Sequence, residues 1–546
     1  MNHSPYQPSG GNRLLAQTVA ASAVRRVTTT TFAAMTLTLG ACASLIPPTR
    51  VPAVVPAAWV GPQPHAGQVS QLSQWWQQQG DSLLAELIDA AQAASPTVAQ
   101  AASRIAAARA NQALARGALL PNVNAQLSST RSQGLSQGGS VGQNTGQNTG
   151  QNTGAGQGGT AISTNAQIGL QAAWEIDLVG ANRAVSNAAR AQVQGSQAQW
   201  HEARVLVAAE VANTYYSLMS CGRQLDVAQR DLQSRAETAR LTQISAKAGF
   251  LAPSVAALAR ASAADGKSRF TQQVALCEVS LKSLVALTAQ AEPELKEKLT
   301  VAHMKSAHAA PISIASLPAQ VIAQRPDVYA AEQDVAQAAA QVGARWADRL
   351  PRLTLAGSIG RASSSGVGYN LSGNTWAFGP LALSLPVFDA GLRAAQVDAA
   401  QAAYGASVSV YQGKVRQAVR EVEEALVNLG STASRGADVQ IAAQGYADVL
   451  AATQARFSQG LASLVELEEA RRNSLAADSN LLSLALERDI AWVSLYRAAG
   501  GGFAPEGAAV ASSAGGGPNV ANAQSARGPS GSAEPIGLVT ARVRAD

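Results

Sequence analysis

The chain has 546 residues, a formal net charge of +6, and 47% hydrophobic residues, but only 4% aromatic and 14% charged residues. This balance excludes a bulky aromatic core and is typical of long helices that pack through small side chains. The basic residues are interspersed with acidic ones along helical stretches, so we expect solvated helix faces and no nucleic-acid partner.

Residues 1–41 have the features of a bacterial lipoprotein signal peptide. Arg25-Arg26 precede a modest apolar segment, and Leu39-Gly40-Ala41 lead into Cys42. The small residues suit the signal peptidase, and the Cys42 thiol would accept the diacylglyceryl group. A plain signal peptide with an incidental cysteine is the alternative. We predict a covalent lipid on Cys42 and no other cofactor, and Ala43 rather than Asp after it favours the outer membrane.

Residues 42–80 form the predicted lipidated N-terminal tether, which is rich in proline before Trp75-Trp76. A first helix is predicted from Asp81, a good N-cap, to about residue 117, with a kink at Pro96. Outside the leader there is no apolar run of about eighteen residues. We therefore expect no transmembrane helix and assign any membrane spanning to strands.

A plan of helix, strand, strand and long helix occurs twice. Ser95-Pro96 correspond to Arg325-Pro326, and Leu120-Pro121 correspond to Leu350-Pro351 at the same sequence offset. Past the strands the offset becomes smaller, which fits loops of unequal length. We predict two structural repeats, 81–290 and 319–498, with an equatorial linker 291–318 that packs as a belt around the helices.

Each repeat contains a predicted β-hairpin, at 119–178 and 351–388. Apolar and polar residues alternate in both, as Leu353 and Leu355 do with Arg352 and Thr354. Two separate hairpins cannot close a sheet, and open strand edges are costly in water or lipid. Self-association into a transmembrane barrel of about eight or more strands would remove those edges. A soluble two-layer sandwich on a helical stalk is the alternative.

Long helices are predicted at 181–247 and 390–457, with Gly430 and Gly436 marking an interruption or bulge in the second. Each long helix ends at a glycine and is followed by another helix, at 252–290 and 462–498. The resulting hairpin tips, Gly249-Phe250 and Gly460-Leu461, are either a docking surface or simple C-cap glycines.

Two segments are too simple in composition to form a core. Residues 134–160 contain three Gly-Gln-Asn-Thr repeats and are predicted to form a surface loop, and the tail 499–546 is predicted to be disordered. We predict no catalytic residue and no metal site, because the histidines lack metal-ligand spacing and no phosphate-binding loop occurs. The histidines are His3, His65, His201, His303 and His308.

Two cysteines flank the first hairpin tip symmetrically. Cys221 lies as far before Gly249 in the sequence as Cys277 lies after it, which places them at the same height in an antiparallel hairpin. A disulfide there is compatible with an oxidising compartment if the Cα atoms approach to about 4.4–6.8 Å. Two buried free thiols are the alternative.

The sequence resembles the TolC-type outer-membrane factor family, in particular the NodT-like lipoprotein branch that serves resistance-nodulation-division efflux systems. The resemblance rests on the duplicated plan and the lipobox together with four motifs: residues 174–178, Arg325-Pro326-Asp327, residues 385–389 and residues 500–502. The fold implied is mixed α and β. Long α-helical hairpins would form a periplasmic α-barrel, and two β-hairpins per chain would contribute to a trimeric, twelve-stranded transmembrane β-barrel.

That family implies an outer-membrane channel of a tripartite efflux system. The homotrimer would passively conduct substrates from an inner-membrane efflux pump, through a periplasmic adaptor protein that meets the helical tips, and would contact outer-membrane lipid. The resemblance further implies that Glu466 and Glu469 form an acidic ring at the periplasmic entrance, favouring cations. A solvated helix face, with Arg471 and Arg472 as counter-charges, is the alternative.

Three other functions compete with efflux, and a periplasmic enzyme is the least favoured of them. A channel of a type I protein secretion system would share this fold. A lipid-anchored structural envelope protein would need no amphipathic hairpins and is disfavoured. We predict that the chain lies at the cell outer membrane, lipid-anchored, with a long periplasmic domain.

Overall fold

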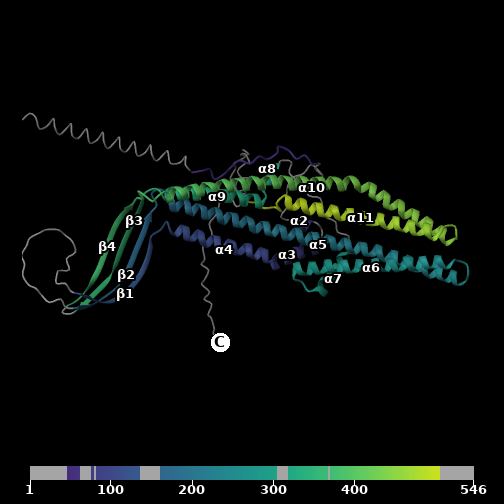
Figure 1. Ribbon diagram of the computed structural model, residues 1–546, viewed down its shortest axis with the longest axis horizontal. Coiled ribbons are helices and arrows are strands. Elements are labelled where there is room, and N and C mark those ends of the chain that lie inside the picture. Colours follow the sequence, from purple (N-terminus) through teal and green to yellow (C-terminus); the bar gives the residue numbers. More distant parts are fainter. Residues whose placement is uncertain are drawn as a thin grey trace, which may run out of the picture. The chain divides into compact units, whose positions relative to one another are not determined.

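The computed structural model describes residues 46–61, 75–78, 81–135, 160–303, 318–366 and 369–504. The chain divides into a large unit, Met1–Phe503, and a C-terminal unit, Ala504–Asp546. The predicted signal peptide, Cys42, most of the Gly-Gln-Asn-Thr loop and residues 505–546 of the predicted tail lie outside the described residues. The predicted start of disorder at residue 499 is wrong, because Ala499 and Phe503 are buried in the large unit. The large unit contains the two repeats (Figure 1).

Both repeats have the same order of elements. The first consists of α3 (Ser82–Ala94), α4 (Pro96–Gly117), β1 (Asn122–Leu135), β2 (Thr160–Ile176), α5 (Ala181–Lys247) and α6 (Pro253–Thr288). The second consists of α9 (Pro326–Ala347), β3 (Arg352–Gly366), β4 (Tyr369–Ser384), α10 (Leu392–Ser458) and α11 (Leu464–Ala498). Three short helices accompany them: α2 (Trp75–Gln78), α7 (Glu292–His303) and α8 (Pro318–Ala323).

The first predicted helix is divided in two. Asp81 caps α3 as expected, because its Oδ1 accepts hydrogen bonds from the backbone N–H groups of Leu83 and Leu84 at 3.1 and 3.3 Å. Ser95 is extended, with ψ 121°, and its hydroxyl caps α4. A residue before proline avoids the helical region, and Pro96 itself suits the first helical position. The chain therefore breaks at Pro96, where only a kink was predicted.

The two long helices, α5 and α10, each have 67 residues. The expected interruption at Gly430 and Gly436 is wrong, because α10 continues through both. A glycine inside a helix costs about 1 kcal/mol. The buried stripe Val415, Val422 and Leu429 offsets this cost by packing into the core of the unit.

The four strands form one antiparallel sheet in the order β1-β2-β3-β4. The two hairpins are joined through β2 and β3, where Gly169 lies opposite Gly360. A Cβ atom on Gly360 would stand 2.4 Å from the carbonyl oxygen of Ile168, so the glycine permits this close approach. The sheet leaves β1 and β4 as its two edges.

A bulge keeps Trp376, Phe378, Leu381 and Leu383 of β4 on one face of the sheet. Leu355 pairs with Leu381 and Gly357 pairs with Phe378, so β4 has one extra residue between the two pairs. The even-numbered residues of β4 before the bulge therefore lie on the same face as the odd-numbered residues after it. The resulting apolar face, which no described helix covers, includes Val123, Leu127, Ile168, Leu170, Trp174, Leu353, Leu355, Ile359, Trp376, Phe378, Leu381 and Leu383.

The main core lies among the helices, where Leu84, Leu87, Tyr215 and Leu495 are wholly buried. At the surface of this core, α7 contacts the neighbouring helices through ion pairs such as that of Lys298 with Glu86 of α3. The described part of the predicted belt therefore contacts α3 and α6. Among the described helices none is by itself long and apolar enough to cross a membrane, although the bent pair Pro253–Thr288 and Glu292–Thr300 passes that test on length and composition.

Candidate functional site

The two helical hairpins end in the same turn, far from the sheet (Figure 1). Gly249 and Gly460 have φ values of 78° and 72°, in the left-handed region that favours glycine. In the first tip the N–H of Phe250 donates to the carbonyl of Ser245 at 2.9 Å, and in the second Leu461 donates to Arg456 at 2.8 Å. These bonds close each helix as a Schellman motif and leave Phe250 and Leu461 exposed.

Glu466 caps the N-terminus of α11, a role that the sequence patterns did not predict. It forms a capping box with Ser463: its carboxylate accepts from the Ser463 N–H at 3.3 Å, and the Ser463 hydroxyl accepts from the Glu466 N–H at 3.2 Å. Hydrogen bonds from the hydroxyl and N–H of Ser463 lower the pKa of Glu466. Glu469 is exposed one turn further along α11. The acidic ring stays a prediction, because it depends on several copies.

A buried ionic cluster, which we call the hairpin lock, joins the two hairpins near their tips. It consists of Asp231 and Arg235 on α5 and Glu468 and Arg471 on α11. Arg235 contacts both oxygens of Asp231 at 2.9 Å and also binds Glu468. Arg471 donates to Glu468 at 2.8 Å. The proposed role of Arg471 as a solvent counter-charge is therefore wrong, because it is only 3% exposed.

The four charges that define the lock sum to zero, hydroxyl groups lie around them, and the exposed Arg269 on α6 also pairs with Asp231 at 3.4 Å. Its two arginines face two carboxylates, while Ser262 on α6 accepts from Arg235 at 2.6 Å and Thr238 on α5 accepts from Arg471 at 2.6 Å. Gly266 on α6 makes room, because a Cβ there would lie 2.9 Å from Cδ of Arg235. Removing one partner of such a cluster leaves an uncompensated buried charge.

A second buried cluster lies at the start of α9. Arg325 donates to both oxygens of Asp327 at 2.9 and 2.8 Å, to Glu421 on α10 at 2.8 Å, and to the carbonyl of Ala498 at the end of α11 at 3.0 Å. Burial alone would raise the pKa values of both carboxyls. The hydrogen bonds and charge of Arg325 hold the pKa of Asp327 below its usual range, and a hydrogen bond from Gln417 together with those of Arg325 does the same for Glu421. Nearby, burial and the charge of Asp327 raise the pKa of Glu202.

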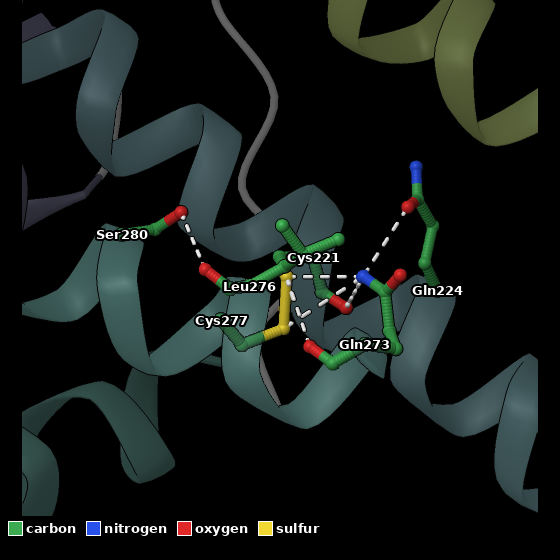
Figure 2. The surroundings of a disulfide bond; sticks show 6 residues. All are labelled: Cys221, Gln224, Gln273, Leu276, Cys277 and Ser280. Atoms are coloured by element: carbon green, nitrogen blue, oxygen red, sulfur yellow. Dashed lines mark hydrogen bonds between the residues drawn. A yellow bond between two sulfur atoms is a disulfide. The ribbon is translucent and has the colours of Figure 1, made fainter. Parts of the chain in front are cut away.

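Figure 2 shows the disulfide that joins Cys221 on α5 to Cys277 on α6, with Cα atoms 5.6 Å apart. The side chain of Gln273 lies beside it, and its amide nitrogen donates to Sγ of Cys221 at 3.1 Å and to the side-chain oxygen Oε1 of Gln224 at 3.3 Å. At the equivalent positions before and after Gly460 of the second tip, the chain has Thr432 and Arg488. The covalent bridge is therefore restricted to the first hairpin.

Within the described ranges, no cluster of three or more His, Cys, Asp or Glu side chains is arranged to hold a metal ion. The features that stand out are instead an uncovered sheet with two open edges and paired helical hairpins with exposed tips. This combination is the architecture of an outer-membrane channel subunit. Residues 87–290 and 317–501 match the family described as outer membrane efflux protein, and the chain belongs to this family.

Relatives and solved structures agree with this assignment. The chain is 27% identical to the solvent efflux pump outer membrane protein SrpC of Pseudomonas putida over 86% of this chain and 97% of the relative. It is 27% identical to nodulation protein T of Rhizobium leguminosarum bv. trifolii over 79% and 88%. The fold matches the outer-membrane channel OprN with a TM-score of 0.70, at 25% identity over 83% and 98% of the two chains.

The open-state MtrE outer membrane channel of Neisseria gonorrhoeae gives a TM-score of 0.69 at 25% identity, over 83% of this chain and 97% of that one. The predicted family, the mixed α and β fold and the efflux function are confirmed by these matches. The protein is an outer-membrane efflux channel protein with a long helical domain.

Proposed function

We propose that three copies of the chain form one continuous channel through the outer membrane and the periplasm. Substrates would enter from an inner-membrane pump through a periplasmic adaptor and pass outward passively, without a catalytic step. The observation that carries this proposal is the four-stranded sheet, which has an uncovered apolar face and two unpaired edges. Four strands cannot close a barrel, whereas three copies supply twelve.

The sheet is suited to a membrane in length and pattern. Its strands have 14, 17, 15 and 16 residues, more than the roughly ten needed to span the hydrocarbon core. The face opposite the apolar one contains Asn124, Gln126, Gln171 and Ser358, which suits a water-filled lumen. At the other end of the helices, exposed Phe250 and Leu461 offer the adaptor two apolar tips per copy.

The segment 46–61, which we call the strap, supports lipid anchoring next to the sheet. Ile46 packs on Gly343, where a Cβ atom would lie 3.4 Å from Ile46, near the end of α9 that faces the sheet. The strap then follows α10, where the Tyr404 hydroxyl donates to the carbonyl of Pro48 at 3.0 Å. Cys42 precedes Ile46 by four residues, a reach of at most about 14 Å. A lipid on Cys42 would thus enter the periplasmic leaflet.

One preparation tests the proposed function. Protein purified from outer membranes is expected to have acyl chains on Cys42 by mass spectrometry, the mass of a trimer in detergent, and ion conductance in planar bilayers. A monomer that does not conduct would contradict the channel. An unmodified peptide that runs through Cys42 would contradict lipidation alone.

Glu423 is expected to hold the end of the strap. Its two carboxylate oxygens each accept one backbone N–H, from Val60 and from Gly61, both at 2.7 Å. Glu423→Ala removes both bonds, so limited proteolysis should cut the strap several times faster than in the parent protein. The neighbouring Glu424→Ala, which breaks an exposed pair with Arg420, is the matched control. Equal cleavage rates in both variants would contradict this role.

The acidic ring can be separated from the capping role by two variants. Glu469→Ala and Glu466→Ala should each reduce cation preference in planar bilayers, because three copies place six carboxylates at one constriction. Only Glu466→Ala should also lower thermal stability, since Glu466 completes the capping box with Ser463. Reversal potentials under a salt gradient measure selectivity. Unchanged potentials in both variants would count against the ring.

A further inference from the structure

An apolar hollow lies at the first edge of the protomer, where α4 meets the sheet. It has a volume of about 1010 Å³ and is lined mainly by small residues and leucines. Leu114 and Leu120 are 74% and 66% exposed there, although both are large apolar side chains. Its lining includes Ala110, Ala113, Leu114, Gly117, Leu120 and Trp174, together with the polar residues Asn122, Glu175 and Thr354.

The residues of α4 that line the hollow lie off the face that packs on α5. Along α4, the buried residues Ala101, Ala108 and Ala115 recur every seven positions and form its inner face, and α5 is the helix packed beside it. Leu114 and Gly117 are rotated away from that stripe, because each residue advances about 100° around a helix. This outer face of α4 has no partner among the described residues.

A second apolar surface lies at the opposite edge, immediately after β4. Val387 and Phe388 are 90% and 89% exposed, and Leu385 is also exposed. We call residues 385–388 the edge segment. The alternation in the sequence placed Leu385 and Val387 within the strand, but β4 ends at Ser384. No described part of the chain covers the edge segment.

Strand register places the two surfaces at the same level. Ser384 pairs with Arg352 and Leu353 pairs with Ile176, while Ala173 pairs with Asn122 at the start of β1. The end of β4 and the start of β1 therefore lie at the same end of the sheet, on opposite edges. In a ring of identical copies, β4 of one copy runs antiparallel beside β1 of the next.

We propose that the edge segment of one copy fills the hollow between α4 and the sheet of the next copy. This inference rests on the proposed ring and names the contact that holds it just below the membrane-spanning strands. Phe388 and Val387 supply bulk, and the small residues of α4 leave the space that receives them. The contact occurs three times in the ring and removes exposed apolar surface at both edges of each copy. Each copy inserts its edge segment into one neighbour and receives the edge segment of the other in its hollow.

Cross-linking in native outer membranes tests the contact directly. Full-length protein with Leu120→Cys and Val387→Cys should form covalent oligomers up to the trimer with a short bismaleimide. The matched control pairs Leu120→Cys with Leu371→Cys, because Leu371 lies near the other end of β4. A trimer by mass that gives no cross-link at Val387 would overturn the contact and leave the channel standing. Absence of any trimer would overturn the ring itself.

A second measurement distinguishes the neighbouring copy from lipid. A spin label at Val387→Cys should collide rarely with both oxygen and a water-soluble nickel chelate, as expected inside a protein contact. A label at Trp376→Cys, on the apolar face of the sheet, supplies the lipid-exposed reference. High oxygen accessibility at both positions would assign the edge segment to lipid and refute the proposal.

Substitution tests the energetics. Phe388→Ser should reduce the trimer fraction in dilute detergent about tenfold or more, because three buried aromatic side chains are lost from each ring. Phe388→Leu keeps an apolar side chain and should retain most of the trimer. Equal trimer fractions in both variants would contradict a packing role. Circular dichroism of each variant confirms that the helices remain folded.

Discussion

Arg325→Met is expected to lower the free energy of unfolding by about 3–5 kcal/mol, the cost of leaving buried charges without a partner. Asp327 and Glu421 would both lose their cation, and the Ala498 carbonyl at the end of α11 would lose its donor. Chemical unfolding followed by circular dichroism measures the change. Arg420→Met, which breaks only an exposed pair with Glu424, should have little effect.

The same variant should change how stability depends on pH. In the parent protein the pKa values of Asp327 and Glu421 are lowered in the folded state. Their contribution is therefore complete above the unfolded values, about 3.9 and 4.3, and is lost as the pH falls through the lower folded values. Without Arg325, burial favours the protonated form of Asp327, while Glu421 keeps the hydrogen bond from Gln417. The stability difference between parent and variant should shrink on acidification, and a constant difference would contradict this account.

Glu468→Gln is expected to open the periplasmic end of the channel. The change leaves Arg235 and Arg471 facing Asp231 alone, so the hairpin lock acquires a buried net positive charge. The contact between α5 and α11 should weaken by about 3 kcal/mol or more. Single-channel recordings should then show a larger fraction of open time or a higher conductance.

Two further variants make the Glu468 result specific to the hairpin lock. Glu424→Gln, which neutralises an exposed glutamate on α10 outside both the lock and the predicted acidic ring, should leave the lock intact. Glu468→Gln combined with Arg471→Met restores the charge balance and should recover part of the lost stability. Identical recordings for the parent and Glu468→Gln would show that the lock does not restrain the entrance.

The long helices were predictable because their signals are local. Residues 181–247 contain no proline and are followed by Gly249, and α5 has those bounds. The pairing of β2 with β3 and the bulge opposite Leu355 were not predictable. Both depend on the register of strands that are far apart in sequence, which single-strand alternation does not determine.

The ionic clusters show a similar limit. Asp231 with Arg235 and Glu468 with Arg471 are spaced as ordinary helix-surface pairs, and such spacing is typical of solvated faces. Only packing of α5 against α11 reveals that they are buried together. Conversely, the equal spacing of Cys221 and Cys277 from Gly249 was sufficient to place them at one height, and the structure brings their Cα atoms within bonding range.

The position of that disulfide along the chain bears on how the protein is made. Both cysteines belong to the first repeat, so an exported chain presents them to the oxidising compartment before its second repeat has emerged. The first hairpin can thus be fixed covalently while the second is still being translocated, and the loop that the bridge closes no longer samples extended states. The half that arrives later then folds against a template whose two helices are already held together.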